Sequence, residues 1–301
     1  MASANAFDFK LFKRLLEFTK PYRLVFYFVA FTALILSGLA ILRPYFLERA
    51  IDESIIPRDP SGLIYFIVIM IGVLVLEVIF QFSFIFYANW LGQHIIKDLR
   101  ISLFGLMMRF KMKYFDTSSV GRLTTRAVND IETISSIFSQ GLFMIIADLL
   151  KMAAIATFML YQSWRLSLIV FVILPLILIA TRIFQRAMKV AFEEVRAQVA
   201  NLNSFVQERI TGMKIVQVFA REQTEYKQFF AINEKHKKAW IKTVWYNSIF
   251  FPIAEMASSV AIGLLVWFGG LNAASNGVIT LGLVVAFIEL AQMLFRPLRQ
   301  I

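Results

Sequence analysis

The chain has 301 residues, of which 59% are hydrophobic and 17% are charged, and its formal net charge is +11. Soluble domains carry about 25% charged residues, and so few charges could not cover a globule of this length. The composition therefore excludes an ordinary soluble protein and favours a membrane protein, whose lipid-facing surface stays apolar. Because long apolar runs dominate the sequence, the positive charge indicates basic cytoplasmic segments and excludes a nucleic-acid partner.

The N-terminal segment, residues 1–21, carries phenylalanine and leucine at helical spacing, with lysine and arginine between them. This pattern is typical of an amphipathic helix that lies on the inner surface of a membrane. The alternative is an ordinary helical lead-in to the segment that follows. We expect an elbow helix over 1–21 and a membrane domain over 22–301.

Six apolar segments each reach the length of about 20 residues that a membrane-spanning helix needs. Three connections between them are short and nearly free of lysine and arginine, whereas two are long and basic. Because basic segments stay on the cytoplasmic side, we expect both termini and both long connections in the cytoplasm. The predicted spans are 22–50, 63–91, 137–161, 164–184, 244–271 and 279–301, with short connections at 52–62, 162–163 and 272–278 and long ones at 92–136 and 185–243.

The long connections are predicted to be helical extensions of the spans. They contain no proline, and Leu99, Leu103, Leu106 and Phe110 continue an apolar pattern at helical spacing. A helix from Leu63 to Lys113 would be roughly 75 Å long, whereas the hydrocarbon layer is about 30 Å thick. The excess length predicts contact with another domain in the cytoplasm.

The first long connection has one predicted break, between Tyr114 and Leu123. Aspartate, threonine and serine there favour turns and helix caps, and Gly121 permits a reversal of the chain.

The second long connection breaks at Thr211-Gly212. A short helix with an apolar stripe of Ile215, Val216 and Phe219 follows the break. An apolar stripe at a solvent-facing tip predicts a docking surface. The alternative, that these residues pack against neighbouring cytoplasmic helices, is equally compatible with the composition.

Ionisable residues at membrane depth cost about 2.5–3.5 kcal/mol each on insertion scales, so they face a cavity or a partner. Asp148 and Lys151 lie three residues apart on one helical face and can neutralise each other. Glu77, Glu255 and Glu289 have no partner nearby in the sequence, and we expect them to line a translocation cavity that favours cationic, amphipathic substrates. Pairing across helices is the alternative. The candidate cavity residues are Glu77, Asp148, Lys151, Glu255 and Glu289.

No catalytic or metal-binding pattern is found in the sequence. There is no cysteine, and His94 and His236 have no spaced ligand partner, so we predict no metal site.

Short motifs occur at both breaks, after the third span and along the sixth span. They are Tyr114-Phe115-Asp116 with Gly121-Arg122-Leu123, Arg126 and Asn129-Asp130; Glu208, Gly212, Lys214, Val216, Phe219 and Glu222; Trp164-Arg165-Leu166-Ser167-Leu168; and Thr280-Leu281-Gly282 with Ala286-Phe287-Ile288 and Phe295-Arg296-Pro297-Leu298. Taken in chain order, over nearly the whole chain, they resemble the transmembrane domain of ABC exporters of the half-transporter type, which includes the lipid A flippase and bacterial multidrug exporters.

The resemblance implies an all-α membrane protein with six transmembrane helices and long cytoplasmic extensions, the type IV ABC exporter fold. It also implies two coupling helices, one around Phe115 to Gly121 and one from Met213 to Phe219, that rest on nucleotide-binding domains. The residues implied for the first are Tyr114, Phe115, Asp116, Gly121, Arg122, Leu123, Arg126 and Asp130, and for the second Glu208, Gly212, Lys214, Ile215, Val216, Phe219 and Glu222.

The implied partners are membrane lipid, a second half-transporter (the same chain or a paralogue) and a nucleotide-binding domain that holds ATP and Mg²⁺. The implied location is the inner (plasma) membrane, with multiple passes. The two transmembrane domains would alternate between inward-facing and outward-facing states and carry lipid-like or amphipathic drug-like substrates.

The phosphate-binding loop of an ATPase is missing, because no Gly-x-x-x-x-Gly-Lys-Ser/Thr occurs in the 301 residues. We therefore expect no cofactor and no enzymatic activity in this chain alone, and an ATP-hydrolysing translocase in the full-length protein. A fragment of a longer protein is the expected explanation, with a separately encoded ATPase as the alternative.

Two other functions keep the same spans but lack ATP coupling: a passive permease subunit and a non-catalytic membrane scaffold. A passive channel does not need two long cytoplasmic hairpins with docking tips, so that feature favours the exporter.

Overall fold

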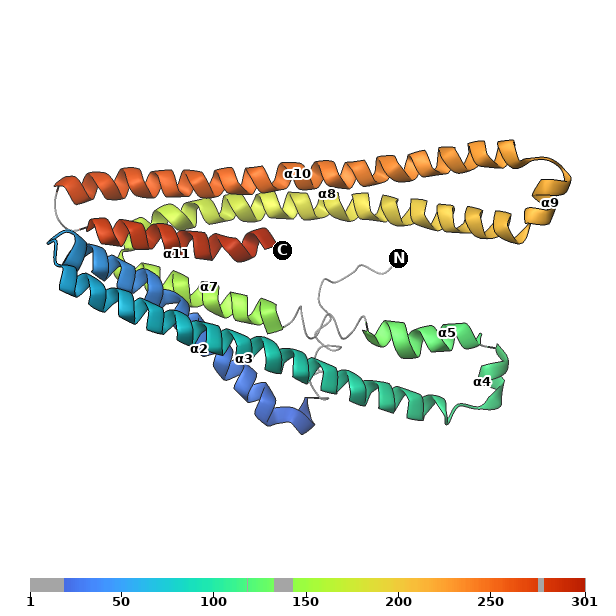
Figure 1. The fold of residues 1–301 in the computed structure, drawn as a ribbon, viewed down its shortest axis with the longest axis horizontal. Helices are drawn as coiled ribbons and strands as arrows, with labels where there is room; N and C mark the ends of the chain where they lie inside the picture. The colour runs from blue at the N-terminus through green and yellow to red at the C-terminus, as the bar shows by residue number, and fades with distance from the viewer. Residues whose placement is uncertain (1–18, 118, 133–142, 276–278, 301) are drawn as a thin grey trace. The chain divides into compact units, whose positions relative to one another are not determined.

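The computed structural model describes residues 19–117, 119–132, 143–275 and 279–300, and these residues are helical, without a strand among them (Figure 1). Six of the described helices are long and apolar enough to cross a membrane, as the sequence predicted. The chain divides into two compact units: residues 1–162 with 279–290, and residues 163–278 with 291–301. The predicted elbow helix over 1–21 lies largely outside the described residues.

The first unit is built around α2, which packs against both α3 and α7. Seven buried side chains of these three helices form its core cluster, and Val29, Leu91 and Ile95 are at most 1% exposed. The elements of this unit are η1 (Lys20–Tyr22), α2 (Arg23–Ala50), the π-helical segment η2 (Ile51–Ile55), α3 (Pro60–Met107), α4 (Met112–Thr117), α5 (Val120–Thr125), the π-helical segment η3 (Arg126–Asp130), α7 (Phe143–Gln162) and the first half of α11 (Leu281–Gln300).

The start of α3 is fixed by its N-cap. The Asp59 carboxylate accepts hydrogen bonds from the backbone amides of Ser61 (3.0 Å) and Gly62 (3.1 Å), and Pro60 occupies the first helical turn. The hydrogen bond from the Ser61 hydroxyl, together with these amides, lowers the pKa of Asp59 below its ordinary value, so the cap stays ionised at neutral pH. The predicted loop over 52–62 is therefore too long, because η2 continues the helix to Ile55 and α3 begins at Pro60.

The far end of α3 also differs from the prediction of a helix running to Lys113. The helix ends at Met107, where the amides of Arg109 and Phe110 bond to carbonyls only three residues back, at 3.0 and 3.1 Å. These short-range bonds tighten the last turn and end the regular helix. Even so, α3 has 48 residues, or roughly 72 Å at 1.5 Å per residue.

The second unit is an antiparallel hairpin of two long helices joined by a short one (Figure 1). The rings of Phe184 and Phe250 stack with centroids 4.1 Å apart, and Lys242 Nζ donates to Glu194 Oε2 over 2.8 Å. Both contacts join the two long helices. The elements are α8 (Trp164–Thr211), α9 (Met213–Val218), α10 (Glu222–Ser275) and the second half of α11.

The predicted helical extension of the fourth and fifth spans is confirmed, because α8 has 48 residues and α10 has 54 without interruption. The break at Thr211-Gly212 is also confirmed, since α8 ends at Thr211 and Gly212 is its C-cap. The loop predicted over 272–278 is shorter than expected, because α10 continues to Ser275. The single residue Ser163 separates α7 from α8.

Apolar surface on α3 has no protein covering in the first unit. Only 6% of the most apolar stretch of this helix is buried, and exposed side chains such as Ile71, Val75 and Ile79 follow its length. An uncovered apolar surface of this extent is expected of a helix that faces lipid or another membrane protein.

The C-terminal end of α2 and the following η2 contact α7 and α11 through polar groups. Gln162 Nε2 donates to Glu48 Oε2 over 3.0 Å, and the Gly282 amide donates to Asp52 Oδ1 over 2.9 Å. Position 282 requires glycine, because a Cβ there would collide with the backbone carbonyl of Glu48 and lie 2.8 Å from the Asp52 carboxylate.

Replacing Gly282 by alanine is therefore expected to destabilise the first unit by roughly 1–3 kcal/mol, the usual cost of overpacking. The measurement is the melting temperature of the purified protein in detergent. Gly72→Ala is the matched control, since nothing lies within 4 Å of a Cβ at that position, and it should leave the melting temperature unchanged or raise it. Equal melting temperatures for the two variants would contradict the close packing at Gly282.

Candidate functional site

The tip of the second unit is α9, a six-residue helix held between two tight turns. The Gly212 amide donates to the Glu208 carbonyl over 2.9 Å, and the Arg221 amide donates to the Val216 carbonyl over 3.0 Å. Ala220, between α9 and α10, has φ of 47°, a left-handed conformation that non-glycine residues seldom adopt. The connections between α9 and the two long helices are therefore only a few residues long.

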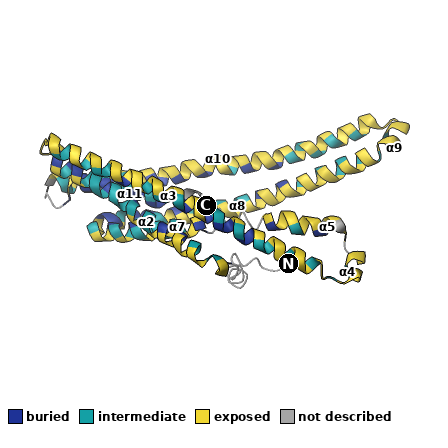
Figure 2. Ribbon diagram, turned by 60° about the horizontal axis from the view of Figure 1, so that its bottom comes forward, coloured by how far each residue is buried: buried dark blue, intermediate teal, exposed yellow. Residues whose placement is uncertain are grey.

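Apolar side chains of α9 and its C-cap are exposed, beside the exposed polar residues Lys214 and Gln217. Ile215 is 65% exposed, and Val218 and Phe219 are each 71% exposed. The predicted stripe is right for Ile215 and Phe219, but Val218 takes the place of Val216, which is half-buried. Figure 2 shows α9 and the adjoining ends of α8 and α10 largely as exposed surface. Within this unit no neighbour covers the stripe, which favours docking over internal packing.

The side of α9 that faces α8 and α10 is a polar cleft of about 430 Å³. Of the predicted tip residues, Glu208, Gly212, Ile215 and Val216 line it, whereas Lys214 and Glu222 are exposed to solvent. Four further lining residues were missed in the sequence: Gln228 and the charged residues Arg209, Arg221 and Glu225. Their opposite charges flank the predicted break at Thr211-Gly212, and this placement could have indicated in the sequence that they lie at the tip.

The tip of the first unit consists of α4 and α5. The Tyr114 ring packs edge-on against Phe110, with centroids 4.7 Å apart, and Leu123 is 7% exposed. Gly121 does not make the predicted reversal, because it is the second residue of the regular helix α5. Asp116, Arg126 and Asp130 are exposed, and the side chain of Arg122 lies outside the described residues.

Beside this tip lies an apolar groove of about 730 Å³. It runs between the C-terminal end of α3 and the segment from α4 to η3, and the predicted residues Phe115 and Leu123 both line it. Ile101, Phe104 and Val128 complete its apolar wall. The first tip therefore combines exposed charges with an apolar hollow.

The candidate cavity residue Glu289 has a partner that its sequence neighbourhood does not reveal. Arg43 of α2 donates to Glu289 Oε1 from both Nε (2.9 Å) and Nη2 (2.6 Å). The side chains are 40% and 23% exposed. The pair joins the first and sixth spans and neutralises both charges at membrane depth. For Glu289, therefore, the alternative expectation is confirmed: its carboxylate pairs with a residue of another helix.

The other candidate cavity residues are spread over both units. Glu77 on α3, and Asp148 and Lys151 on α7, are half-buried in the first unit, whereas Glu255 on α10 is exposed in the second. Asp148 and Lys151 lie on one helix at the expected spacing, and their mutual neutralisation stays a prediction. A shared cavity lined by these residues also stays a prediction.

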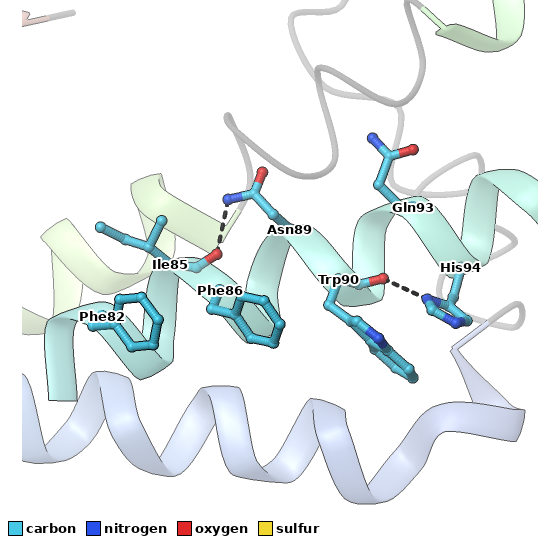
Figure 3. Close-up of a pocket in the computed structure, with 7 residues that line it drawn as sticks. All are labelled: Phe82, Ile85, Phe86, Asn89, Trp90, Gln93 and His94. Atoms are coloured by element: carbon cyan, nitrogen blue, oxygen red, sulfur yellow. Dashed lines mark hydrogen bonds between the residues drawn. The ribbon is translucent and has the colours of Figure 1, made fainter. Parts of the chain in front are cut away.

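A further groove, of about 480 Å³, follows one stretch of α3 (Figure 3). Figure 3 shows the rings of Phe82, Phe86 and Trp90 on one side of the helix and the amides of Asn89 and Gln93 on another. The Trp90 and His94 rings stack with centroids 3.6 Å apart.

Tyr22 links the start of α2 to this stretch of α3. Its ring packs edge-on against Trp90, with centroids 5.8 Å apart, and its hydroxyl donates to Asp98 Oδ2 over 3.0 Å. Tyrosine and tryptophan collect at membrane–water boundaries, so these contacts indicate where the hydrocarbon layer ends along α3.

Comparison with known proteins identifies the family of this chain. The ABC transporter transmembrane region family matches residues 26–298. An uncharacterized ABC transporter ATP-binding protein, YknV of Bacillus subtilis, is 29% identical over 290 residues, which cover 96% of this chain and 48% of that protein. An ATP-dependent lipid A-core flippase of Thiobacillus denitrificans is 22% identical over 97% of this chain and 50% of its own length.

A putative ABC transporter ATP-binding protein of Streptococcus pneumoniae, exp8, is 27% identical over 96% of this chain and 49% of its own length. The chain thus spans about half the length of the curated relatives it matches. The family match over residues 26–298, together with the six apolar helices, establishes that the chain belongs to the ABC transporter transmembrane region family.

Proposed function

We propose that the chain is the membrane-spanning translocation module of an ATP-driven exporter subunit. With a second copy or a paralogue it forms an alternating-access pathway through the inner membrane, and both termini lie in the cytoplasm. The observation that carries the proposal is α9, whose exposed apolar side chains lie at the end of a hairpin of 48- and 54-residue helices. A docking surface so far beyond the bilayer needs a cytoplasmic partner.

The partner of this surface is a nucleotide-binding domain that holds ATP and Mg²⁺. Two relatives are named ATP-binding proteins and one an ATP-dependent flippase, and each is about twice as long as this chain. ATP hydrolysis therefore belongs to the whole transporter, whereas the residues described above bind the motor and carry its motion. Membrane lipid surrounds the spans. Because long apolar runs accompany the positive charge, we propose no nucleic-acid partner.

The helices of the second unit suit the transmission of motion. At 1.5 Å per residue α8 is roughly 72 Å long, against about 30 Å of hydrocarbon. Cross-helix contacts continue along the cytoplasmic part, including the Lys242–Glu194 ion pair and the Phe192–Trp240 ring contact at 6.4 Å. A displacement of α9 is thus carried along two braced helices to the fourth and fifth spans.

The substrate we propose is lipid-like or an amphipathic drug-like molecule. The cationic preference expected from three intramembrane carboxylates is weaker than the sequence suggested, because Arg43 neutralises Glu289. Glu77 and Glu255 are the two remaining carboxylates at which this preference is tested. A passive permease or a scaffold subunit remains the second candidate, and it differs by needing no contact at α9.

The coupling role of α9 is tested with Ile215→Asp and Phe219→Asp in the transporter, purified together with its nucleotide-binding domains and reconstituted in liposomes. A charge on either side chain adds a desolvation cost to docking, so we expect transport per ATP hydrolysed to fall at least about 10-fold. Phe230→Asp, at a 61% exposed position on α10, is the matched control and should retain coupling. Full coupling in both tip variants would favour the passive permease or the scaffold.

The ion pair between the first and sixth spans is tested with Glu289→Gln. Arg43 would then lose a charged partner at membrane depth, and we expect a loss of roughly 1–3 kcal/mol of stability, seen as a lower melting temperature. The exchanged pair Arg43→Glu with Glu289→Arg should recover most of this loss. A melting temperature that does not change in Glu289→Gln would show that the pair contributes nothing.

The substrate preference is tested with Glu77→Gln and Glu255→Gln, assayed for export of one cationic and one neutral amphipathic dye. Removal of a carboxylate from the pathway should lower cation export selectively, by at least about fivefold, because the opposite charge no longer attracts the cation. Equal export of both dyes by both variants would rule out a carboxylate-lined cavity.

A further inference from the structure

A compact ionic and aromatic cluster joins the cytoplasmic ends of α8 and α10. Arg209, on the last turn of α8, donates from Nε to Glu225 Oε2 on α10 over 2.5 Å and from Nη1 to Glu208 Oε1 over 2.9 Å. Arg221 Nε lies 3.8 Å from the other oxygen of Glu225. The Arg209 and Glu225 side chains are 30% and 15% exposed, so the pair is largely shielded from solvent.

Aromatic rings hold the same guanidinium in place. Arg209 Cζ lies 4.9 Å from the centre of the Phe205 ring, and Phe205 lies 6.3 Å from Phe229 of α10, measured between ring centroids. A guanidinium that stacks on a ring and forms directed hydrogen bonds is fixed in orientation, which a flexible lysine ammonium could not reproduce. Arg209 thus contacts both helices through two kinds of interaction.

The helix α9 depends on this cluster for its orientation. It has only six residues, too few to be stable as an isolated helix. Behind it lies the cleft, whose lining on α8 and α10 is charged at Glu208, Arg209 and Glu225. Its two ends are attached through Gly212 and through Phe219 and Ala220, which lie immediately beside the residues of the cluster.

We infer that Arg209, paired with Glu225, is the positioning residue of the second tip: it fixes the orientation of α9 and links displacement of α9 to α8 and α10 together. This inference rests on the proposed coupling function. Without the pair, the two helix ends separate locally, and the docking stripe of Ile215, Val218 and Phe219 loses its fixed direction.

The inference is tested with Arg209→Gln, Arg209→Lys and the exchanged pair Arg209→Glu with Glu225→Arg. Lys242→Gln is the matched control, because Lys242–Glu194 joins the same two helices over 2.8 Å but lies far along the hairpin from α9. Two quantities are measured for each variant: hydrogen–deuterium exchange of residues 212–221, and transport per ATP hydrolysed in the transporter with its nucleotide-binding domains.

In Arg209→Gln we expect exchange over 212–221 to accelerate at least about 10-fold, because local opening no longer breaks the pair, and transport per ATP to fall by a similar factor. Arg209→Lys should give a smaller change of the same sign, the exchanged pair should restore part of both quantities, and Lys242→Gln should change neither. A purely structural role would alter the melting temperature of all variants alike and leave the ratio of transport to hydrolysis unchanged.

Unchanged exchange over 212–221 in a folded Arg209→Gln protein would overturn the inference. So would unchanged coupling in Arg209→Gln when Phe219→Asp uncouples transport, and in that case the proposed function would stand. If Phe219→Asp leaves transport coupled, the proposed function fails, and the exchange measurement still decides whether Arg209 orients α9.

Discussion

The constraint on which the structure depends is the hydrocarbon layer, which offers no hydrogen-bond partner to the backbone. A helix satisfies most of its own amides and carbonyls there, and six described helices are long and apolar enough to cross the layer. The same layer makes isolated charges costly, so Arg43 and Glu289 pair across two spans. Polar contacts at Glu48 and Asp52 lie at the end of α2, where polar groups reach water or the lipid headgroups.

Beyond the bilayer the helices continue because nothing in the sequence stops them. Pro175 and Pro252 lie within α8 and α10, and the first break in the chain after the fourth span comes at Gly212, which α9 follows. A long helix costs little to extend in water when a second helix braces it, as Phe205–Phe229 and Lys242–Glu194 do. Length and bracing together make α8 and α10 a continuous connection between the exposed tip and the fourth and fifth spans.

The sequence predicts the features that depend on local pattern. The spans follow from apolar length, and the second break follows from Gly212. The prediction was wrong at Gly121 and at the end of α3, because helices of six residues, such as α4 and α5, are too short to show a period. Arg43 and Glu289, 246 positions apart, meet only in the folded chain, and no single sequence reveals that contact. The sequence shows that Arg209 and Glu225 carry opposite charges, but it does not show that their side chains form an ion pair.

The central claim is that α9 projects into the cytoplasm, where an ATPase domain can reach it. Because the chain has no cysteine, a single introduced cysteine reports its own side of the membrane. Phe219→Cys and Ile56→Cys, which are 71% and 58% exposed in the parent chain, are treated in intact cells with a membrane-impermeant maleimide. The account predicts labelling at position 56 in intact cells and at position 219 only after permeabilisation. Labelling of position 219 from outside would contradict it.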